Sequence, residues 1–151
     1  MADLQARLAA LNAEYARAID DDRLEEWPGF FLARCLYKIT TADNVKQGYQ
    51  AGLVYADSRA MLQDRVSALR EANVYERQRY RHILGAPALL SDGVLETAFL
   101  VVRIMRDGKM DLFATGRYLD RVSEEENSLK YAERIVICDS SRFDTLLAIP
   151  L

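Results

Sequence analysis

Apolar residues recur every three or four positions in two stretches of this chain, and every second position over much of the rest. The first stretch covers residues 3–20 and aligns Leu4, Leu8, Leu11, Tyr15 and Ile19. The second begins at Asp57 or Ser58, either of which can cap a helix, and runs to about Ala72. Both spacings predict amphipathic helices that bury one face against the rest of the fold.

A short helix is predicted directly after the first one. Asp22 and Glu25 have the spacing of a capping-box variant, and Pro28 with Gly29 closes the segment. Trp27 lies inside it, and we expect this side chain and the neighbouring aromatic residues to close part of the core.

Alternation of apolar and polar residues predicts a run of strands. We expect strands at residues 32–41, 53–55, 83–90, 94–106, 109–122 and 129–138, with a loop at 42–52. Pro87 places the 83–90 strand at a sheet edge or at a bulge. Asp107 and Gly108, between the two longest strands, predict a tight hairpin in which both residues adopt positive φ.

The end of the chain is also patterned. Strict alternation in the last strand sets Tyr131 and Glu133 on the face opposite Arg134. The apolar tail up to Leu151 should pack against the body of the protein or against a partner.

Helices first and antiparallel strands afterwards indicate an α+β fold, a curved antiparallel sheet with the helices on its concave face. We find no linker or repeat, so we expect one domain, residues 1–151.

The segment ALREANVYERQRYRHIL, residues 68–84, joins the helical part to the strands and holds the only histidine. Arg77, Arg79 and Arg81 alternate, so an extended backbone points them to one side, and His82 falls on the other. A row of planar cations where the helical part meets the strands predicts a ligand-facing surface or a docking surface. The alternative is ion pairing within the chain, for example with Glu71, or solvation.

Composition limits the classes of partner that the chain is expected to bind. Half of the residues are apolar, 28% are charged and the formal net charge is -3, so nothing draws the whole chain to nucleic acid or to an anionic membrane. No apolar run approaches the roughly 20 residues of a membrane span, and the first residues lack a signal-peptide core. We therefore expect a cytoplasmic protein, with Cys35 and Cys138 as buried free thiols.

The residue inventory also limits the chemistry. A Rieske cluster needs two cysteines and two histidines, and a mononuclear oxygenase iron needs two histidines with a carboxylate, whereas this chain has one histidine. It has neither a GxSxG elbow nor a glycine-rich phosphate loop. Catalysis by this chain alone would have to use carboxylates, tyrosines and His82.

Several segments resemble one known family. They are EWPGFF, the block GLVYADSRAMLQDRVSALREANVYERQRYRHILG from Gly52 to Gly85, RYLDR, ERIVICDS and DTLLAIPL. Together with the order of the elements they are similar to the small (beta) subunit of aromatic ring-hydroxylating dioxygenases, which has the nuclear-transport-factor-2-like cone fold. The likeness extends over nearly the whole chain.

The resemblance implies a structural subunit of a heterohexamer with three large (alpha) and three small subunits, in which small subunits also contact one another. The large subunits would carry the Rieske [2Fe-2S] cluster, the mononuclear Fe(II) and the substrate pocket, and this chain no catalytic, cofactor-binding or metal-binding residue. The complex would add both atoms of dioxygen to an aromatic carboxylate such as terephthalate, with electrons from NADH or NADPH through a reductase.

Three hypotheses can be separated by the interior of the cone. An assembly subunit predicts an interior filled by Tyr, Phe and Leu side chains and apolar surface left exposed; its candidate partner contacts are the arginine row and His82. A stand-alone isomerase or dehydratase of the same fold predicts an open pocket, with Asp20, Asp57 or a tyrosine about 3 Å from His82 as its acid–base partner. A ligand-binding protein predicts the pocket without that pair.

Overall fold

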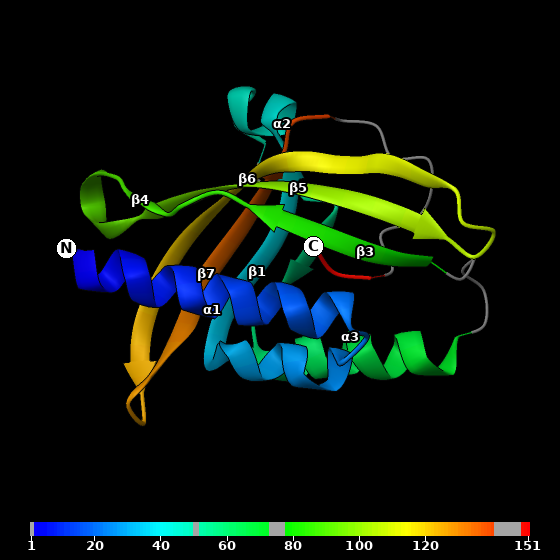
Figure 1. Ribbon diagram of the computed structural model, residues 1–151. Coiled ribbons are helices and arrows are strands. Elements are labelled where there is room, and N and C mark those ends of the chain that lie inside the picture. Colours follow the sequence, from blue (N-terminus) through cyan, green and yellow to red (C-terminus); the bar gives the residue numbers. More distant parts are fainter. Residues whose placement is uncertain (1, 50–51, 73–77, 141–148) are drawn as a thin grey trace.

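One strongly curved sheet dominates the computed structural model, which describes residues 2–49, 52–72, 78–140 and 149–151 (Figure 1). Within these ranges the strands are β1 Phe31–Thr41, β2 Val54–Ala56, β3 Gln78–Leu84, β4 Ala88–Leu89, β5 Leu95–Met105, β6 Met110–Glu125 and β7 Ser128–Cys138. Their order is β2-β1-β7-β6-β5-β3, and β4 also pairs with β5. Neighbours are antiparallel except β1 and β7, which are parallel. The fold is therefore the expected α+β cone.

Within the described residues the helices are α1 Ala2–Asp20, η1 Leu24–Phe30, α2 Ala42–Lys46, α3 Arg59–Glu71 and η2 Ser91–Gly93, where η denotes a 3-10 helix. Figure 1 shows α1 lying across the concave face, with η1 and α3 beside it. The apolar stripe of α1 is buried at Leu8, Tyr15 and Ile19, and that of α3 at Leu62, Val66 and Leu69. Ser58 caps α3, because its hydroxyl accepts from the backbone N–H of Met61.

Two predictions about short helices are wrong. The capping box is absent: Arg23 precedes η1 without a side-chain cap, and Asp22 has a positive φ of 60°. Its carboxylate instead accepts from the guanidinium of Arg70 on α3. Residues 42–52 are not only loop, because α2 forms there. The Thr41 side chain accepts from the Asn44 N–H and so caps it, a short-range signal hidden at the end of a strand.

The strands that follow α3 also differ from the prediction. The stretch 83–90 is not continuous: β3 extends from Gln78 to Leu84, and β4 resumes only at Ala88, past the buried Pro87. Proline has no N–H to give to a sheet, which explains the break. As expected, β3 lies at an edge of the sheet.

The prediction that Asp107 and Gly108 both adopt positive φ is wrong. At the β5–β6 turn only Gly108 has a positive φ, 91°, and Met105 N–H donates to the Lys109 carbonyl across a three-residue loop. Asp107 does not need the left-handed region there. The two-residue turn with both φ values positive joins β6 to β7, at Glu126 (52°) and Asn127 (67°).

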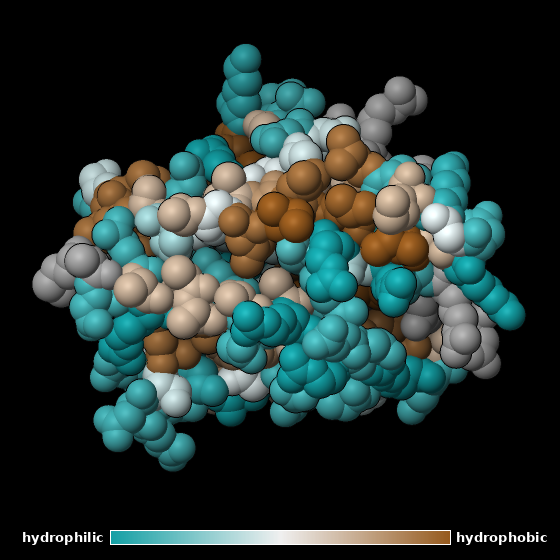
Figure 2. Space-filling view, in the orientation of Figure 1, coloured by the Kyte–Doolittle hydropathy of each residue, from teal (hydrophilic) through white to brown (hydrophobic). Residues whose placement is uncertain are grey.

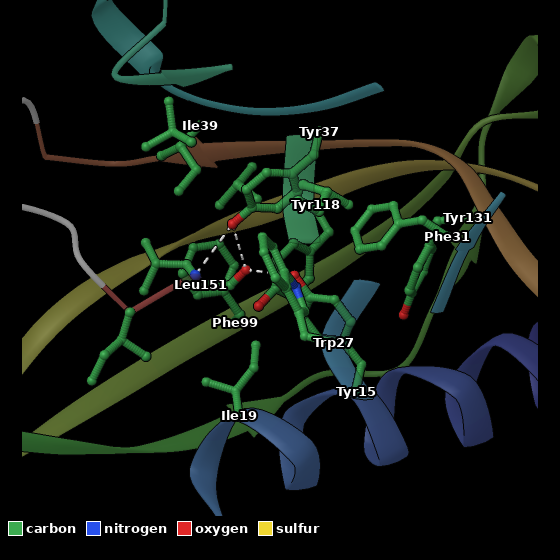
Figure 3. Packing of buried hydrophobic residues seen from close by; sticks show 14 of the residues in the cluster. Tyr15, Ile19, Trp27, Phe31, Tyr37, Ile39, Phe99, Tyr118, Tyr131 and Leu151 are labelled. Atoms are coloured by element: carbon green, nitrogen blue, oxygen red, sulfur yellow. Dashed lines mark hydrogen bonds between the residues drawn. The ribbon is translucent and has the colours of Figure 1, made fainter. Parts of the chain in front are cut away.

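Aromatic side chains fill the interior between α1, η1 and the sheet (Figure 3). The largest buried ones are Tyr15, Trp27, Phe31, Tyr37, Tyr80, Phe99, Tyr118 and Tyr131. Most meet edge to face, with Trp27 and Tyr37 ring centroids 5.2 Å apart. This filling is the arrangement that an assembly subunit predicts.

Candidate functional site

Asp20 and His82 form a buried pair where the end of α1 meets the edge strand β3. The Asp20 carboxylate accepts from the His82 backbone N–H at 2.9 Å and lies 2.7 Å from His82 Nδ1. Both side chains are almost wholly enclosed, with 4% and 0% exposed. We call this pair the clasp, because it joins the first helix to the edge strand β3.

The clasp supplies only part of what acid–base catalysis needs. A carboxylate does stand about 3 Å from the imidazole, as the isomerase hypothesis requires. Yet His82 Nε2 is buried and has no hydrogen-bond partner in the described part of the chain. The histidine lines neither the cavity beside Ile19 and Met105 nor the one beside Glu25 and Pro28. Asp57 is no substitute, since it follows β2 at the opposite edge of the sheet.

The structure describes two of the three alternating arginines. Arg79 and Arg81 are exposed on β3, on the side opposite Tyr80 and His82, as the alternation predicts. Arg81 approaches the clasp from outside, with Nη1 4.0 Å from the Asp20 carboxylate. Arg77 lies outside the described residues. The burial of the His82 side chain removes it from any surface that a partner could touch in this conformation.

A buried charge network that the sequence pattern did not reveal lies deeper in the cone. Arg134 donates from Nε and Nη2 to both oxygens of Asp120, each at 2.8 Å, and both side chains have no exposed surface. Arg134 Nη2 also donates to the Asn12 side chain at 2.6 Å, which in turn accepts from Tyr131 and donates to Thr97. The network links α1 to β5, β6 and β7.

Three tyrosine rings surround the same guanidinium. Arg134 Cζ lies 3.7 Å from the centroid of Tyr118, 4.1 Å from Tyr131 and 4.4 Å from Tyr15. Burial alone would lower the pKa of Arg134, but the charge and hydrogen bonds of Asp120 together with the neighbouring tyrosines outweigh burial, and the pKa is raised well above its ordinary value. Burial raises the pKa values of all three tyrosines, so all three side chains stay neutral.

A β-bulge explains why strict alternation set Tyr131 on the wrong side of Arg134. The β6–β7 register shifts between Arg121 and Val122, so Ala132 is an extra residue on β7. Tyr131 therefore shares the concave side with Arg134, while Glu133 stays on the convex side. A bulge has no strong sequence signature here, and strict period two could not find it.

The last residues of the sequence fill the remaining interior. Leu151 has no exposed surface; its carbonyl accepts from Tyr15 at 2.7 Å and from Tyr37 at 3.0 Å, and its N–H donates to Tyr37 at 3.2 Å (Figure 3). Ile149 is buried too. The expectation that this tail packs on the body is confirmed for the described residues 149–151.

A cavity of about 520 Å³ opens at one end of the cone, between the ends of α1 and α3 and the β3–β5 edge. Its apolar lining is Ile19, Tyr80, Ile104, Met105 and Ile149. Its polar lining is Asp22, Arg70, Gln78, Arg79 and Arg106. We call it the mouth cavity.

The convex face of the sheet carries apolar side chains where three strands lie side by side. Ile83, Met110 and Leu112 are 55%, 68% and 72% exposed, and the half-buried Leu100, Val102 and Ile104 lie between them in the β3–β5–β6 register. We call these six residues the outer patch. Brown side chains gather over β3 and β5 in Figure 2, and Arg79 and Arg81 border the patch.

The two cysteines are buried free thiols, as predicted. Burial raises the pKa of Cys138 to about 12 and also raises that of Cys35, so neither is an activated nucleophile. Among the described residues no three His, Cys, Asp or Glu side chains converge in a way that could hold a metal. No described helix is long and apolar enough to span a bilayer.

Comparisons with known proteins agree with one another. The family model of the ring hydroxylating beta subunit matches residues 14–145. The beta 1 subunit of the terminal oxygenase component of terephthalate 1,2-dioxygenase from Comamonas sp is 49% identical, over 97% of this chain and 98% of its own length. The anthranilate 1,2-dioxygenase small subunit from Burkholderia cepacia is 37% identical over 93% of this chain and 90% of its own.

A solved structure extends the likeness to three dimensions. It is the beta subunit assigned to an aromatic-ring-hydroxylating dioxygenase of Novosphingobium aromaticivorans, with a TM-score of 0.88 and 35% identity. The match covers 98% of this chain and 97% of that one.

Proposed function

The chain belongs to the ring-hydroxylating beta subunit family, and on that premise we propose that it is the scaffold small subunit of a terephthalate dioxygenase. It is a structural beta subunit, and such a subunit implies a large alpha partner. Identity of 49% over almost the full length of a terephthalate dioxygenase subunit favours that substrate among aromatic carboxylates.

The proposed complex is a cytoplasmic heterohexamer of three large and three small subunits. The Rieske [2Fe-2S] cluster, the mononuclear Fe(II) and the substrate pocket belong to the large subunits, because one histidine and two buried cysteines cannot supply either set of ligands. When bound there, these centres supply cis-dihydroxylation by dioxygen, with electrons from NADH or NADPH through a reductase. This chain contributes shape and contacts.

The outer patch is the observation that best supports a partner surface. Large side chains such as Leu112 and Met110 remain more than two-thirds exposed on a regular sheet, where a soluble monomer would place polar residues. Arg79 and Arg81 border the outer patch, and arginine beside apolar side chains is a composition favoured at protein interfaces. We therefore keep both as partner-contact residues, opposite carboxylates or carbonyls of a neighbouring subunit.

The decisive experiment purifies this chain with its candidate large subunit and compares each alone with the pair. We expect the chain alone to hold no stoichiometric iron and to convert no terephthalate. The pair should elute as one hexamer and turn over terephthalate in the presence of the reductase. Iron bound stoichiometrically by this chain, or turnover by it alone, would refute the scaffold role.

The clasp keeps one alternative open, an isomerase or dehydratase that uses Asp20 and His82. Against it stand the enclosed imidazole and the filled interior. Activity of the isolated chain on a small-molecule substrate, abolished by His82→Ala with the fold intact, is the result that this alternative requires.

A further inference from the structure

We propose that the mouth cavity receives a segment of the large subunit, which inserts one large apolar side chain into it and places a carboxylate beside the arginines at its rim. The partner is the large subunit of the proposed function, so the proposal rests on that function. The cavity volume, about 520 Å³, has room for a leucine, methionine or phenylalanine side chain with part of its backbone.

The outer patch alone is too small for a stable interface. Its six side chains are at most 72% exposed, and three of them are half-buried. Together they expose less than the roughly 800 Å² that each partner of a stable complex commonly buries. The contact with the large subunit must therefore extend past the patch.

The mouth cavity is the apolar surface that continues the outer patch. Ile104 belongs to the patch and also lines the cavity, and Arg79 borders the one and lines the other. From there the lining passes around the end of the β3–β5 edge to the concave side, where Tyr80 and Met105 lie. A partner that covers the convex face at Ile104 thus has direct access to the cavity.

The floor of the cavity suits an inserted apolar side chain. Ile19, Tyr80 and Ile149 are each at most 7% exposed, so the core fixes this part of the lining. The Tyr80 ring is stacked on Phe113, with centroids 5.3 Å apart. A preformed pocket lowers the cost of binding, and side chains enclosed in such pockets contribute most to the affinity of an interface. Met105 is flexible enough to adapt to the side chain that enters.

Gln78 favours a piece of polypeptide over a hydrocarbon. Its side-chain Oε1 is buried at the cavity and accepts no hydrogen bond from the described residues. A buried acceptor without a donor costs free energy. A backbone N–H of the inserted segment can donate to this oxygen, whereas an apolar side chain alone cannot.

The charge at the rim specifies what accompanies the apolar side chain. Arg70 is already occupied, since it donates to Glu25 and Asp22. Arg79 and Arg106 have no carboxylate partner among the described residues. A guanidinium can donate two parallel hydrogen bonds to one carboxylate, so an aspartate or glutamate of the inserted segment fits this rim.

Photo-crosslinking of the assembled complex tests where the large subunit lies. The methionines of the full chain are replaced by photo-methionine, which on irradiation forms a covalent bond to a group in contact with it. Met105 lines the cavity, Met110 belongs to the outer patch, and Met61 is 38% exposed on α3, outside both. We expect Met105 and Met110 to link to the large subunit in far higher yield than Met61. The large-subunit peptide linked to Met105 should contain a large apolar residue with Asp or Glu close to it in sequence.

A variant that fills the cavity tests whether insertion contributes to affinity. Met105→Trp places a bulky ring where the partner side chain would enter, and we expect association with the large subunit to weaken about 30-fold or more. Met105→Leu is the matched control, because it nearly keeps the volume of the side chain, and its association should change less than about threefold. Analytical ultracentrifugation measures association, and thermal unfolding checks that both variants remain folded.

A second variant tests the rim and leaves the cavity floor untouched. Arg106→Glu reverses an exposed charge, so the fold should be retained while association weakens about tenfold or more at low salt and by a smaller factor at high salt. Arg34→Glu is its control, because Arg34 is an exposed arginine on β1 that does not line the cavity.

Either of two results would overturn the proposal: a crosslinking yield at Met105 no higher than at Met61, or unchanged association in both Met105→Trp and Arg106→Glu. The scaffold role survives these results, because the unaltered chain still assembles with the large subunit. Failure of the unaltered chain to assemble would instead remove the proposed function, and the occupant of the cavity with it.

Discussion

Arg134 inside the cone and Arg79 at its edge are the same residue type in opposite surroundings. Arg134 has no exposed surface, two bonds to Asp120, one to Asn12 and three tyrosine rings around it. Arg79 is exposed and borders apolar side chains. The interior thus contains polar side chains where apolar ones are usual, and most of their hydrogen bonds are made within the chain. The convex face instead carries apolar side chains where polar ones are usual, and these side chains stay exposed.

This difference distinguishes residues that stabilise the fold from residues that we propose contact a partner. A buried ion pair adds little net stability over a well-packed apolar core, but it fixes which elements meet, because a misplaced partner leaves a charge uncompensated. The network of Arg134 therefore acts within the chain, to set the position of α1 on the sheet. The outer patch makes no such contacts between elements of the chain, and we propose that a partner covers it.

The largest expected effect lies in the interior. Arg134→Met leaves the Asp120 carboxylate buried without its cation, and we expect a loss of about 3–5 kcal/mol in the free energy of unfolding, measured in urea. Arg117→Met, which breaks the exposed pair with Glu96, should cost less than about 1 kcal/mol. Equal losses in the two variants would contradict a structural role for the buried network.

The outer patch should show the reverse behaviour. Leu112→Asp places a charge on a side chain that is 72% exposed, so the free energy of unfolding should change by no more than about 0.5 kcal/mol. Association with the large subunit should weaken about 30-fold or more, since a charge would lie unpaired in an apolar contact. Analytical ultracentrifugation of the mixed subunits measures it.

Val45→Asp is the control for this substitution. Val45 is also exposed, at 44%, but it lies on α2, away from the patch. Loss of assembly in both variants, or in neither, would remove the outer patch from the interface.

The clasp lies between these extremes, buried but close to the edge strand. His82→Ala leaves the Asp20 carboxylate without the imidazole, and we expect about 1–3 kcal/mol of lost stability in urea unfolding. Turnover per iron of the assembled complex should stay close to that of the unaltered enzyme. A large loss of rate in an intact hexamer would instead make His82 part of the chemistry.

The sequence predicted those features that depend on local spacing. The stripes of α1 and α3 and the placement of His82 on the face opposite Arg79 and Arg81 follow from helical or strand periodicity. Family likeness in the segments from Gly52 to Gly85 supplied the cone. The meeting of Asp20 and His82 was only one of several pairings that the sequence allowed, because it depends on how α1 crosses the sheet.

What the sequence missed depends on long-range pairing. Arg134 shares the interior with Tyr131 because a bulge at Ala132 interrupts the alternation of β7, and its partners Asp120 and Asn12 lie on β6 and α1. The mouth cavity combines ends of α1, α3, β3 and β5, which no local pattern brings together. The tight turn predicted at Asp107-Gly108 did not form because this turn sequence also suits a three-residue loop.

We expect the smallest effect at a solvent-exposed ion pair, which provides a further contrast with the buried Arg134. Arg70 hydrogen-bonds the Glu25 carboxylate and lowers its pKa to about 2. A carboxylate whose pKa is lowered by folding stabilises the protein above its unfolded pKa, and this contribution is lost as the pH falls toward the folded value. The stability difference between the unaltered chain and Glu25→Gln should therefore shrink as the pH is lowered from about 5 to 2.

Solvent limits the size of this effect. Both side chains are well exposed, at 33% for Arg70 and 64% for Glu25, so the difference near neutral pH should be below about 1 kcal/mol and should decrease further in salt. Urea unfolding at several pH values and two salt concentrations measures it. A difference as large as that of Arg134→Met would mean that burial is not what distinguishes the two arginines, and the contrast between the interior and the surface would lose its physical basis.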